Sequence, residues 1–254
     1  MKTLRVATLV PIVVLGALVA PASGGDAAKL TDAQHTRPPV VQLKDARIKF
    51  EINATDGDGG VQVFIDADPW RRMSIYDPRG RLVFTSMTSG NVGRLGGTEL
   101  FLESGEPPFT ELPLDKLLQR FPEGTYRFRG LGLEGERYVG SAELSHDLAD
   151  GPTLVSPLEG GPPQDPNATT VVWEQVEPPS GSEIIAYQVL VVEPETGVVA
   201  LPKVALDVMM QPSATSLEVP PGFLKPGTEY EWEVLAIEAG GNQTLSTSFF
   251  TTAD

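Results

Sequence analysis

Side chains that could bind a metal ion gather in one short stretch of the chain: Asn53, Thr55, Asp56, Asp58, Asp66 and Asp68. Hard cations such as Ca²⁺ take several carboxylate and carbonyl oxygens, and a turn supplies both. The spacing of an EF-hand loop is not met, because the sixth position from Asp56, where glycine is needed, is Val61. A hairpin turn is therefore favoured over a calcium site. If Ca²⁺ is bound, the candidate ligands are Asp56, Asp58, Asp66 and Asp68.

Paired carboxylates could also hydrolyse glycosides, provided that they are held about 5 to 10 Å apart. Glu99, Glu103 and Glu106 follow Asp66 and Asp68 in the sequence and are the candidates. Nothing in the sequence fixes their separation, and with 34 acidic residues some proximity arises by chance. Solvated acidic surface is the favoured interpretation, and a glycan-active hydrolase is the weakest alternative.

Nucleophilic catalysis has little support. A catalytic triad needs a nucleophile, a positioned histidine and an orienting acid, but the chain has only His35 and His146. Ser145 adjoins His146, and neighbours on a strand point to opposite faces. His146 is predicted to make hydrogen bonds between domains. With no cysteine, thiol catalysis and thiolate metal sites are excluded, so we predict a non-enzymatic protein without a cofactor other than the Ca²⁺ alternative.

The charge narrows the choice of partners. The formal net charge is −15, and removal of the first 22 residues leaves 17 basic and 34 acidic residues, a net charge of −17. So acidic a protein repels nucleic acids and anionic lipid headgroups.

Trp70 beside Arg71 and Arg72 could be a recognition patch, although core packing of Trp70 is favoured. Glycosylation acceptor patterns begin at Asn53, Asn167 and Asn242.

The N-terminus predicts export. Residues 1–22 resemble a signal peptide, with Lys2 and Arg5, an apolar stretch from Val6 to Ala20, and small residues before Ser23. The alternative is a membrane anchor, but the run is shorter than the ~20 apolar residues that span a bilayer. The expected location is periplasmic or extracellular, with no membrane insertion after signal cleavage. Residues 23–40 are small, polar and proline-containing, and predict a flexible leader.

Residues 41–148 predict a β-rich domain of unknown family. Two hairpins are expected, 48–53 with 61–65 across a glycine-rich turn, and 72–76 with 81–85 across Asp77-Pro78-Arg79-Gly80. Residues 86–112 are irregular, with a glycine-rich loop and a short strand or helical turn at 98–102. One short helix is predicted over 114–121, between Pro113 and Pro122. Strands at 125–130 and 138–144 complete the domain.

Residues 152–254 contain about seven short apolar runs separated by proline and glycine turns, which predicts a Greek-key sandwich. The strands expected from the pattern are 170–173, 184–192, 198–208, 216–219, 229–237 and 247–251. Residues 152–157 resemble the opening strand of a fibronectin type III domain, and Trp173, Tyr187 and the stretch from Leu224 to Val234 resemble further parts of that domain. This resemblance implies a buried core tryptophan at 173 and a tyrosine corner at Tyr230. The chain as a whole is predicted to be all-β, with two tandem β-sandwich domains.

Three functions follow, in order of preference. The first is an exported, non-catalytic binding or spacer protein with an unknown protein or glycan partner. The second is a calcium-stabilised β module, and the third is a glycan-active hydrolase that uses carboxylates of residues 41–148.

Overall fold

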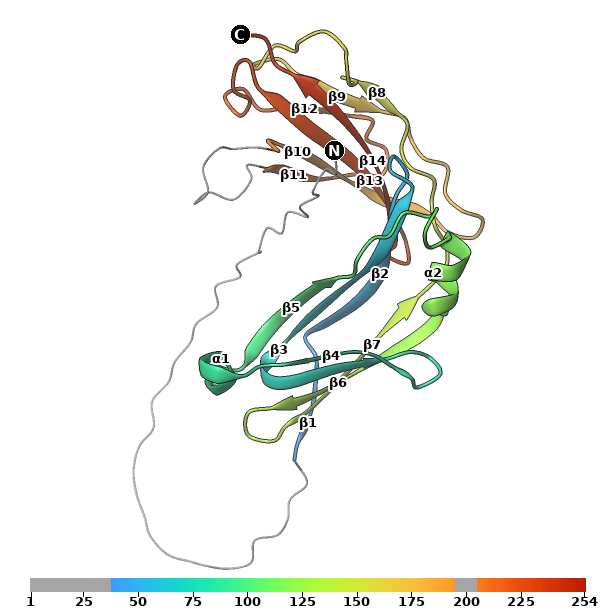
Figure 1. Cartoon of the computed structure of the whole chain (residues 1–254), viewed down its shortest axis with the longest axis vertical. Coiled ribbons are helices and arrows are strands. Elements are labelled where there is room, and N and C mark those ends of the chain that lie inside the picture. The colour runs from blue at the N-terminus through green and yellow to red at the C-terminus, as the bar shows by residue number, and fades with distance from the viewer. Residues whose placement is uncertain (1–37, 195–204) are drawn as a thin grey trace, which may run out of the picture. The chain divides into compact units, whose positions relative to one another are not determined.

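The structure, a computed structural model, describes residues 38–194 and 205–254 (Figure 1). The predicted signal peptide, nearly all of the predicted leader and the first part of the strand predicted at 198–208 lie outside these residues. The described chain is mostly β-strand, as predicted. Neither helix in this part of the chain has the length and apolar character needed to cross a bilayer.

In the first half, one long strand organises the sandwich. β3 (Asp58–Tyr76) pairs through its first part with β2 (Asp45–Asn53) and β5 (Gly97–Glu103). Through its last part it pairs with β4 (Leu82–Met87) and β6 (Gly124–Gly132). β7 (Arg137–Leu144) and β1 (Val40–Gln42) extend the β6 side. Both predicted hairpins are confirmed, but the predicted strands at 61–65 and 72–76 are parts of the single strand β3.

The core of this half follows from alternation along the strands. Side chains on the inner face of these strands are buried, among them Phe50, Ile65, Met73, Ile75, Tyr126 and Phe128. α2 (Leu114–Arg120) is the predicted helix, and it packs on this core through Leu117. A second short helix, α1 (Gly90–Leu95), buries none of its residues and lies where the sequence predicts a loop.

Tyr126 makes a bond that the sequence analysis did not anticipate. Its hydroxyl donates to the carbonyl of Pro122, four residues upstream, at 3.1 Å. In the second half, the hydroxyl oxygen of Tyr230 accepts the backbone N–H of Lys225 at 2.8 Å, which forms the predicted tyrosine corner. A proline, a glycine and a threonine precede each tyrosine within a few residues, so the two halves use similar local chemistry at corresponding turns.

The second half is a sandwich of two sheets. β8 (Leu154–Ser156), β9 (Thr170–Trp173) and β12 (Ser216–Glu218) form the smaller sheet. β10 (Ile184–Val192), β11 (Ala205–Met210), β13 (Glu229–Glu238) and β14 (Gln243–Thr251) form the larger one. Trp173, Tyr187, Tyr230, Trp232 and Val234 lie in the core between them, each at most 1 % exposed. Residues 152–254 thus have a fibronectin type III-like fold.

A parallel pairing joins the two halves. Residues 243–245 of β14 pair with residues 51–53 of β2, so a single hydrogen-bonded sheet of eleven strands runs through both sandwiches. The short loop before β14 strengthens the junction through Asn242, which is 1 % exposed. Asn242 Oδ1 accepts the backbone N–H of Phe50 at 2.9 Å, and Nδ2 donates to the carbonyls of Ser145 and Asp147 at 3.1 and 3.0 Å.

Candidate functional site

The four candidate calcium ligands do not come together. Asp56 lies in the turn before β3, Asp58 begins that strand, and Asp66 follows eight residues later on it. An extended strand rises about 3.3 Å per residue, so the backbones of Asp58 and Asp66 are roughly 26 Å apart. Asp68 pairs with Lys44, whose Nζ lies 2.8 Å from Asp68 Oδ1 and 3.9 Å from Asp66 Oδ1. These four residues therefore cannot ligate one ion together in this geometry.

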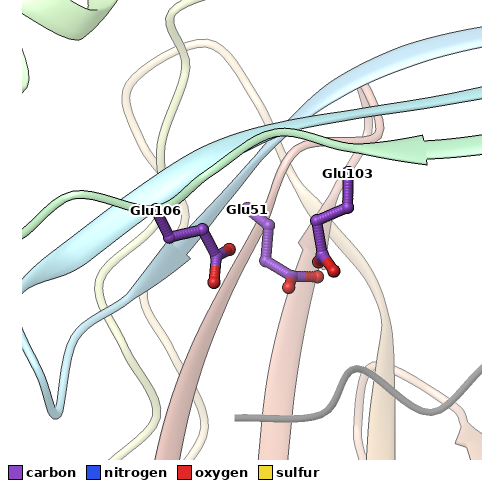
Figure 2. Close-up of side chains that lie close together, drawn as sticks. All are labelled: Glu51, Glu103 and Glu106. Carbon is purple, nitrogen blue, oxygen red and sulfur yellow. The ribbon is translucent and has the colours of Figure 1, made fainter. Parts of the chain in front are cut away.

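A different group of carboxylates does converge. Glu51 on β2, Glu103 at the end of β5 and Glu106 in the following loop each place an oxygen within 4.8 Å of the others (Figure 2). The sheet register explains the meeting, because Glu51 lies opposite Gly60 and Glu103 opposite Gln62. A Cβ at Gly60 would lie 2.6 Å from Ser104 Oγ and 3.0 Å from Glu106 Cγ, so glycine lets the loop cross the strand closely.

Amide side chains from both halves hold this cluster. Gln243 on β14 donates through Nε2 to Glu51 Oε2, and Gln62 Nε2 donates to Glu103 Oε1 at 2.9 Å. Lys49 Nζ donates to Gln243 Oε1 at 2.6 Å. Burial raises the pKa of Glu51 and nearby Glu103 adds to the rise, against the opposing effects of Gln243 and Lys49. Burial likewise lowers the pKa of Lys49. The amide donors thus offset part of the repulsion between the crowded carboxylates, and the raised pKa of Glu51 makes proton binding there more favourable than at an exposed glutamate.

This arrangement suits structure better than hydrolysis. A retaining glycosidase needs carboxyl groups about 5 to 5.5 Å apart on both sides of a bound sugar, and an inverting one needs more. Here three carboxylates crowd together, and two of them are engaged by amides. Two open depressions in the described surface, one beside Asp77 and Arg120 and one beside Ser145 and Glu238, are not lined by any glutamate of the cluster.

A second polar surface is basic. Residues on the outer face of β4, β3, β6 and β7 form three cross-strand rows, each with at least one arginine, and all of them except Ser74 are at least partly exposed. The rows are Met87–Arg72–Leu131–Arg137, Thr85–Ser74–Arg129–Val139 and Leu82–Tyr76–Arg127–Ser141. We call this surface the arginine face. The guanidinium of Arg129 lies over the Tyr76 ring, 5.6 Å from its centroid.

Carboxylates do not neutralise the arginine face. All four arginines are exposed, and across residues 38–194 and 205–254 none of them has an acidic partner within 4.0 Å. Glu143, at the far end of β7, accepts a hydrogen bond from Thr125 instead. The sequence alone did not predict this face. The signal that could have revealed it is the alternation of Arg127 and Arg129 with the buried aromatic residues Tyr126 and Phe128 along one strand.

Comparison with known proteins adds fold neighbours but no relative. The similar structures include fibronectin type III-like modules. The CbhA modules of Clostridium thermocellum align at 9% identity and a TM-score of 0.33, over 82% of this chain and 94% of theirs. Domains FN1–FN3 of chicken CNTN1 align at 17% identity and 0.31, over 85% and 68%. A bacterial ice-binding adhesin aligns at 15% and 0.25, over 85% and 65%. No family model and no curated protein sequence matches the chain. With TM-scores of only 0.33, 0.31 and 0.25, these structural alignments do not indicate what this chain binds.

Other predicted residues have structural roles. Trp70 is 3 % exposed and packs in the core, which is the interpretation that the sequence favoured over a recognition patch.

The prediction that His146 makes hydrogen bonds between domains is wrong. Its Nε2 contacts the Phe121 carbonyl and its backbone N–H donates to Glu123, and both partners lie in the first half. Asn242 makes the connection between the two halves instead.

The three glycosylation acceptor patterns differ in exposure. Asn53 and Asn242 are 6 % and 1 % exposed, so only Asn167 among the three asparagines is exposed to solvent.

Proposed function

We propose that this protein works outside the cytoplasm as a non-catalytic binding or spacer module, in which the fibronectin type III-like half holds the first half in a fixed orientation. The observation that carries the proposal is the joined sheet. β14 pairs with β2, and Asn242 and Gln243 bond to residues of the first half. Such a junction lacks the free linker that lets neighbouring domains reorient.

Spin labels test the fixed orientation directly. The chain has no cysteine, so Ser141→Cys with Ser216→Cys creates one labelled pair across the junction, both positions being exposed. We expect a single narrow distance distribution by double electron–electron resonance. A pair within the first half, Thr98→Cys with Ser141→Cys, is the control for label mobility. A broad distribution for the first pair beside a narrow one for the control would refute the spacer proposal.

Export needs its own test. The predicted signal peptide supports export, and cleavage after Ala22 would leave a mature chain that begins at Ser23. Cell fractionation with N-terminal sequencing of the recovered protein measures both location and cleavage. Full-length chain found in the cytosol would contradict this part of the proposal.

Calcium stabilisation is the alternative proposal, and the glutamate cluster would replace the four aspartates as its ligand set. Carboxylates are ligands that Ca²⁺ prefers, and three of them lie within 4.8 Å. A melting temperature raised by Ca²⁺ in the wild type, and unaffected by it in Glu103→Gln, would support the alternative. Equal melting temperatures in Ca²⁺ and in EDTA would remove it.

A further inference from the structure

Charge is distributed unequally between the two halves. Residues 41–148 hold 13 basic and 17 acidic residues, a net charge of −4. Residues 152–254 hold 2 basic and 14 acidic residues, a net charge of −12. Four of the 13 basic residues in the first half are the arginines of the arginine face. An acidic chain therefore carries one local basic surface, on its first half.

The arginine face has no charge of its own that balances the arginines. Its three cross-strand rows contain no aspartate, glutamate or lysine. Like charges on one sheet face repel one another and oppose folding. A bound anion would relieve that repulsion, so the charge of this surface is complementary to a negatively charged partner.

The shape of the arginine face favours a long partner over a small one. Three rows and four strands give a surface of roughly 14 Å in each direction, from a rise of about 3.4 Å per residue and a strand spacing of about 4.8 Å. The two depressions in the described surface are not lined by any of its four arginines. A small anion would be held from one side only, whereas a polymer that is bound by one arginine meets the next at a high effective concentration.

Hydroxyl groups lie beside the arginines. Thr85 shares a row with Arg129, and Ser141 shares a row with Arg127. Contact of the Arg129 guanidinium with the Tyr76 ring restricts that side chain, so less conformational entropy is lost when it binds an anion. Guanidinium groups form paired hydrogen bonds with carboxylates, and hydroxyls both donate to and accept from the hydroxyls of sugars. This mixture suits a carbohydrate that carries carboxylates.

We propose that the arginine face binds an extended segment of an acidic polysaccharide whose sugars carry carboxylate groups. This deepens the proposed function, on which it rests, by naming the partner class of the binding module. Duplex DNA fits less well, because one charge per ~1.7 Å of its axis would meet strong repulsion from the acidic remainder of the chain. A polysaccharide with one carboxylate per sugar is less densely charged. At about 0.15 M salt the screening length of ~8 Å weakens that distant repulsion more than direct contacts.

Isothermal titration calorimetry with oligogalacturonate long enough to span the face tests the proposal. The wild type is expected to bind, more weakly as salt is raised. Arg127→Gln with Arg129→Gln is expected to weaken binding about tenfold, because two ion pairs are lost. The control, Arg94→Gln with Arg120→Gln, removes the same charge from the two helices and is expected to bind like the wild type. Near-ultraviolet circular dichroism checks that the variants are folded.

A lysine variant separates carboxylate recognition from general attraction to charge. Arg127→Lys with Arg129→Lys keeps the charge of the face but removes the planar fork that pairs with a carboxylate. We expect it to bind oligogalacturonate several-fold more weakly than the wild type does. Equal affinities of the lysine variant and the wild type would mean that only net charge is sensed, and the proposed recognition of carboxylated sugars would be wrong.

Other polymers supply the remaining outcomes. Tighter binding of polyglutamate or duplex DNA than of oligogalacturonate would assign the face to an acidic protein or to nucleic acid and overturn the proposal. Equal binding of neutral dextran, or no binding of oligogalacturonate at low salt, would also overturn it. The spin-label experiment is independent of these titrations. A narrow distance distribution without oligogalacturonate binding would leave the spacer function standing and reject only the polysaccharide partner.

Discussion

At the scale of single residues, two buried tryptophans of the second half differ in their polar pairing. Trp232 Nε1 donates to the carbonyl of Pro157 at 2.9 Å, whereas Trp173 Nε1 is buried without a partner in the structure. Replacing either ring by phenylalanine removes similar apolar area. Trp232→Phe also leaves a carbonyl unpaired, which costs about 1–3 kcal/mol, while Trp173→Phe removes an unpaired donor.

We therefore expect Trp232→Phe to lower the free energy of unfolding by about 1–3 kcal/mol more than Trp173→Phe does. Urea unfolding followed by far-ultraviolet circular dichroism measures both. Equal losses would show that the bond to Pro157 contributes little, or that water pairs with Trp173 in solution.

Glu51 makes the stability depend on pH in an unusual direction for a carboxylate. Its pKa is raised, chiefly by burial, so the folded state binds a proton more tightly than the unfolded state does. The resulting stability is present below the ordinary pKa of about 4.5 and is lost as pH rises through the raised folded value. Glu51→Gln mimics the protonated form and keeps an acceptor for Gln243.

The expected result is that the melting temperature of Glu51→Gln, relative to the wild type, increases between pH 4 and pH 7. Glu99→Gln is the control, because it removes the same charge from an exposed position on the neighbouring strand β5. A difference between Glu51→Gln and the wild type that does not change with pH would contradict the raised pKa.

At the scale of elements, alternation and turn residues predict most strands, because burial of one sheet face leaves a period of two in the sequence. The turn Asp77-Pro78-Arg79-Gly80 has the predicted chemistry: Asp77 Oδ1 accepts the backbone N–H groups of Arg79 and Arg81, and Gly80 has a φ of 80°. The continuity of β3 was not predictable from this pattern, since Asp66 to Trp70 lack alternation and still join its two parts.

The sequence pattern did not predict which strands far apart in the chain pair with each other. Glu51 and Gln243 are 192 residues apart, and no local pattern records that β2 and β14 meet. The glutamate cluster was therefore missed, although Glu103 and Glu106 had been considered as catalytic candidates. Asn242 was noticed for a different reason, as part of a glycosylation acceptor pattern, and its burial reverses that interpretation.

The loop that holds Asn242 connects several elements at once. Asn242→Ala would leave the N–H of Phe50 and the carbonyls of Ser145 and Asp147 without this partner. We expect a loss of about 2–4 kcal/mol in the free energy of unfolding. Asn242→Asp keeps the volume and Oδ1 but places an oxygen against two carbonyls, so it should be at least as destabilising.

Chemical denaturation of both variants checks this expectation. Asn167→Ala is the matched control, since Asn167 is exposed and a change there should stay within about 0.5 kcal/mol. A stable Asn242→Asp protein would mean that the amide donor is unnecessary and that pairing of β14 with β2 holds the junction alone.

At the scale of the whole molecule, we expect the joined sheet to make the two sandwiches, which differ in net charge, unfold together. Destabilising the junction should separate them, because each half has its own buried core. In Asn242→Ala, calorimetry is expected to show two transitions in place of one. The half with net charge −12 is under stronger self-repulsion than the half with −4, and salt screens that repulsion.

Raising the ionic strength from about 0.01 M to about 0.15 M shortens the screening length from ~30 Å to ~8 Å. The transition of residues 152–254 in Asn242→Ala should therefore shift to higher temperature by more than that of residues 41–148. Fluorescence assigns the transitions, because Trp173 and Trp232 report only the second half once Trp70 is replaced by phenylalanine. Equal shifts of both transitions would mean that the acidic charges of the second half are spaced widely enough to leave its folding unaffected.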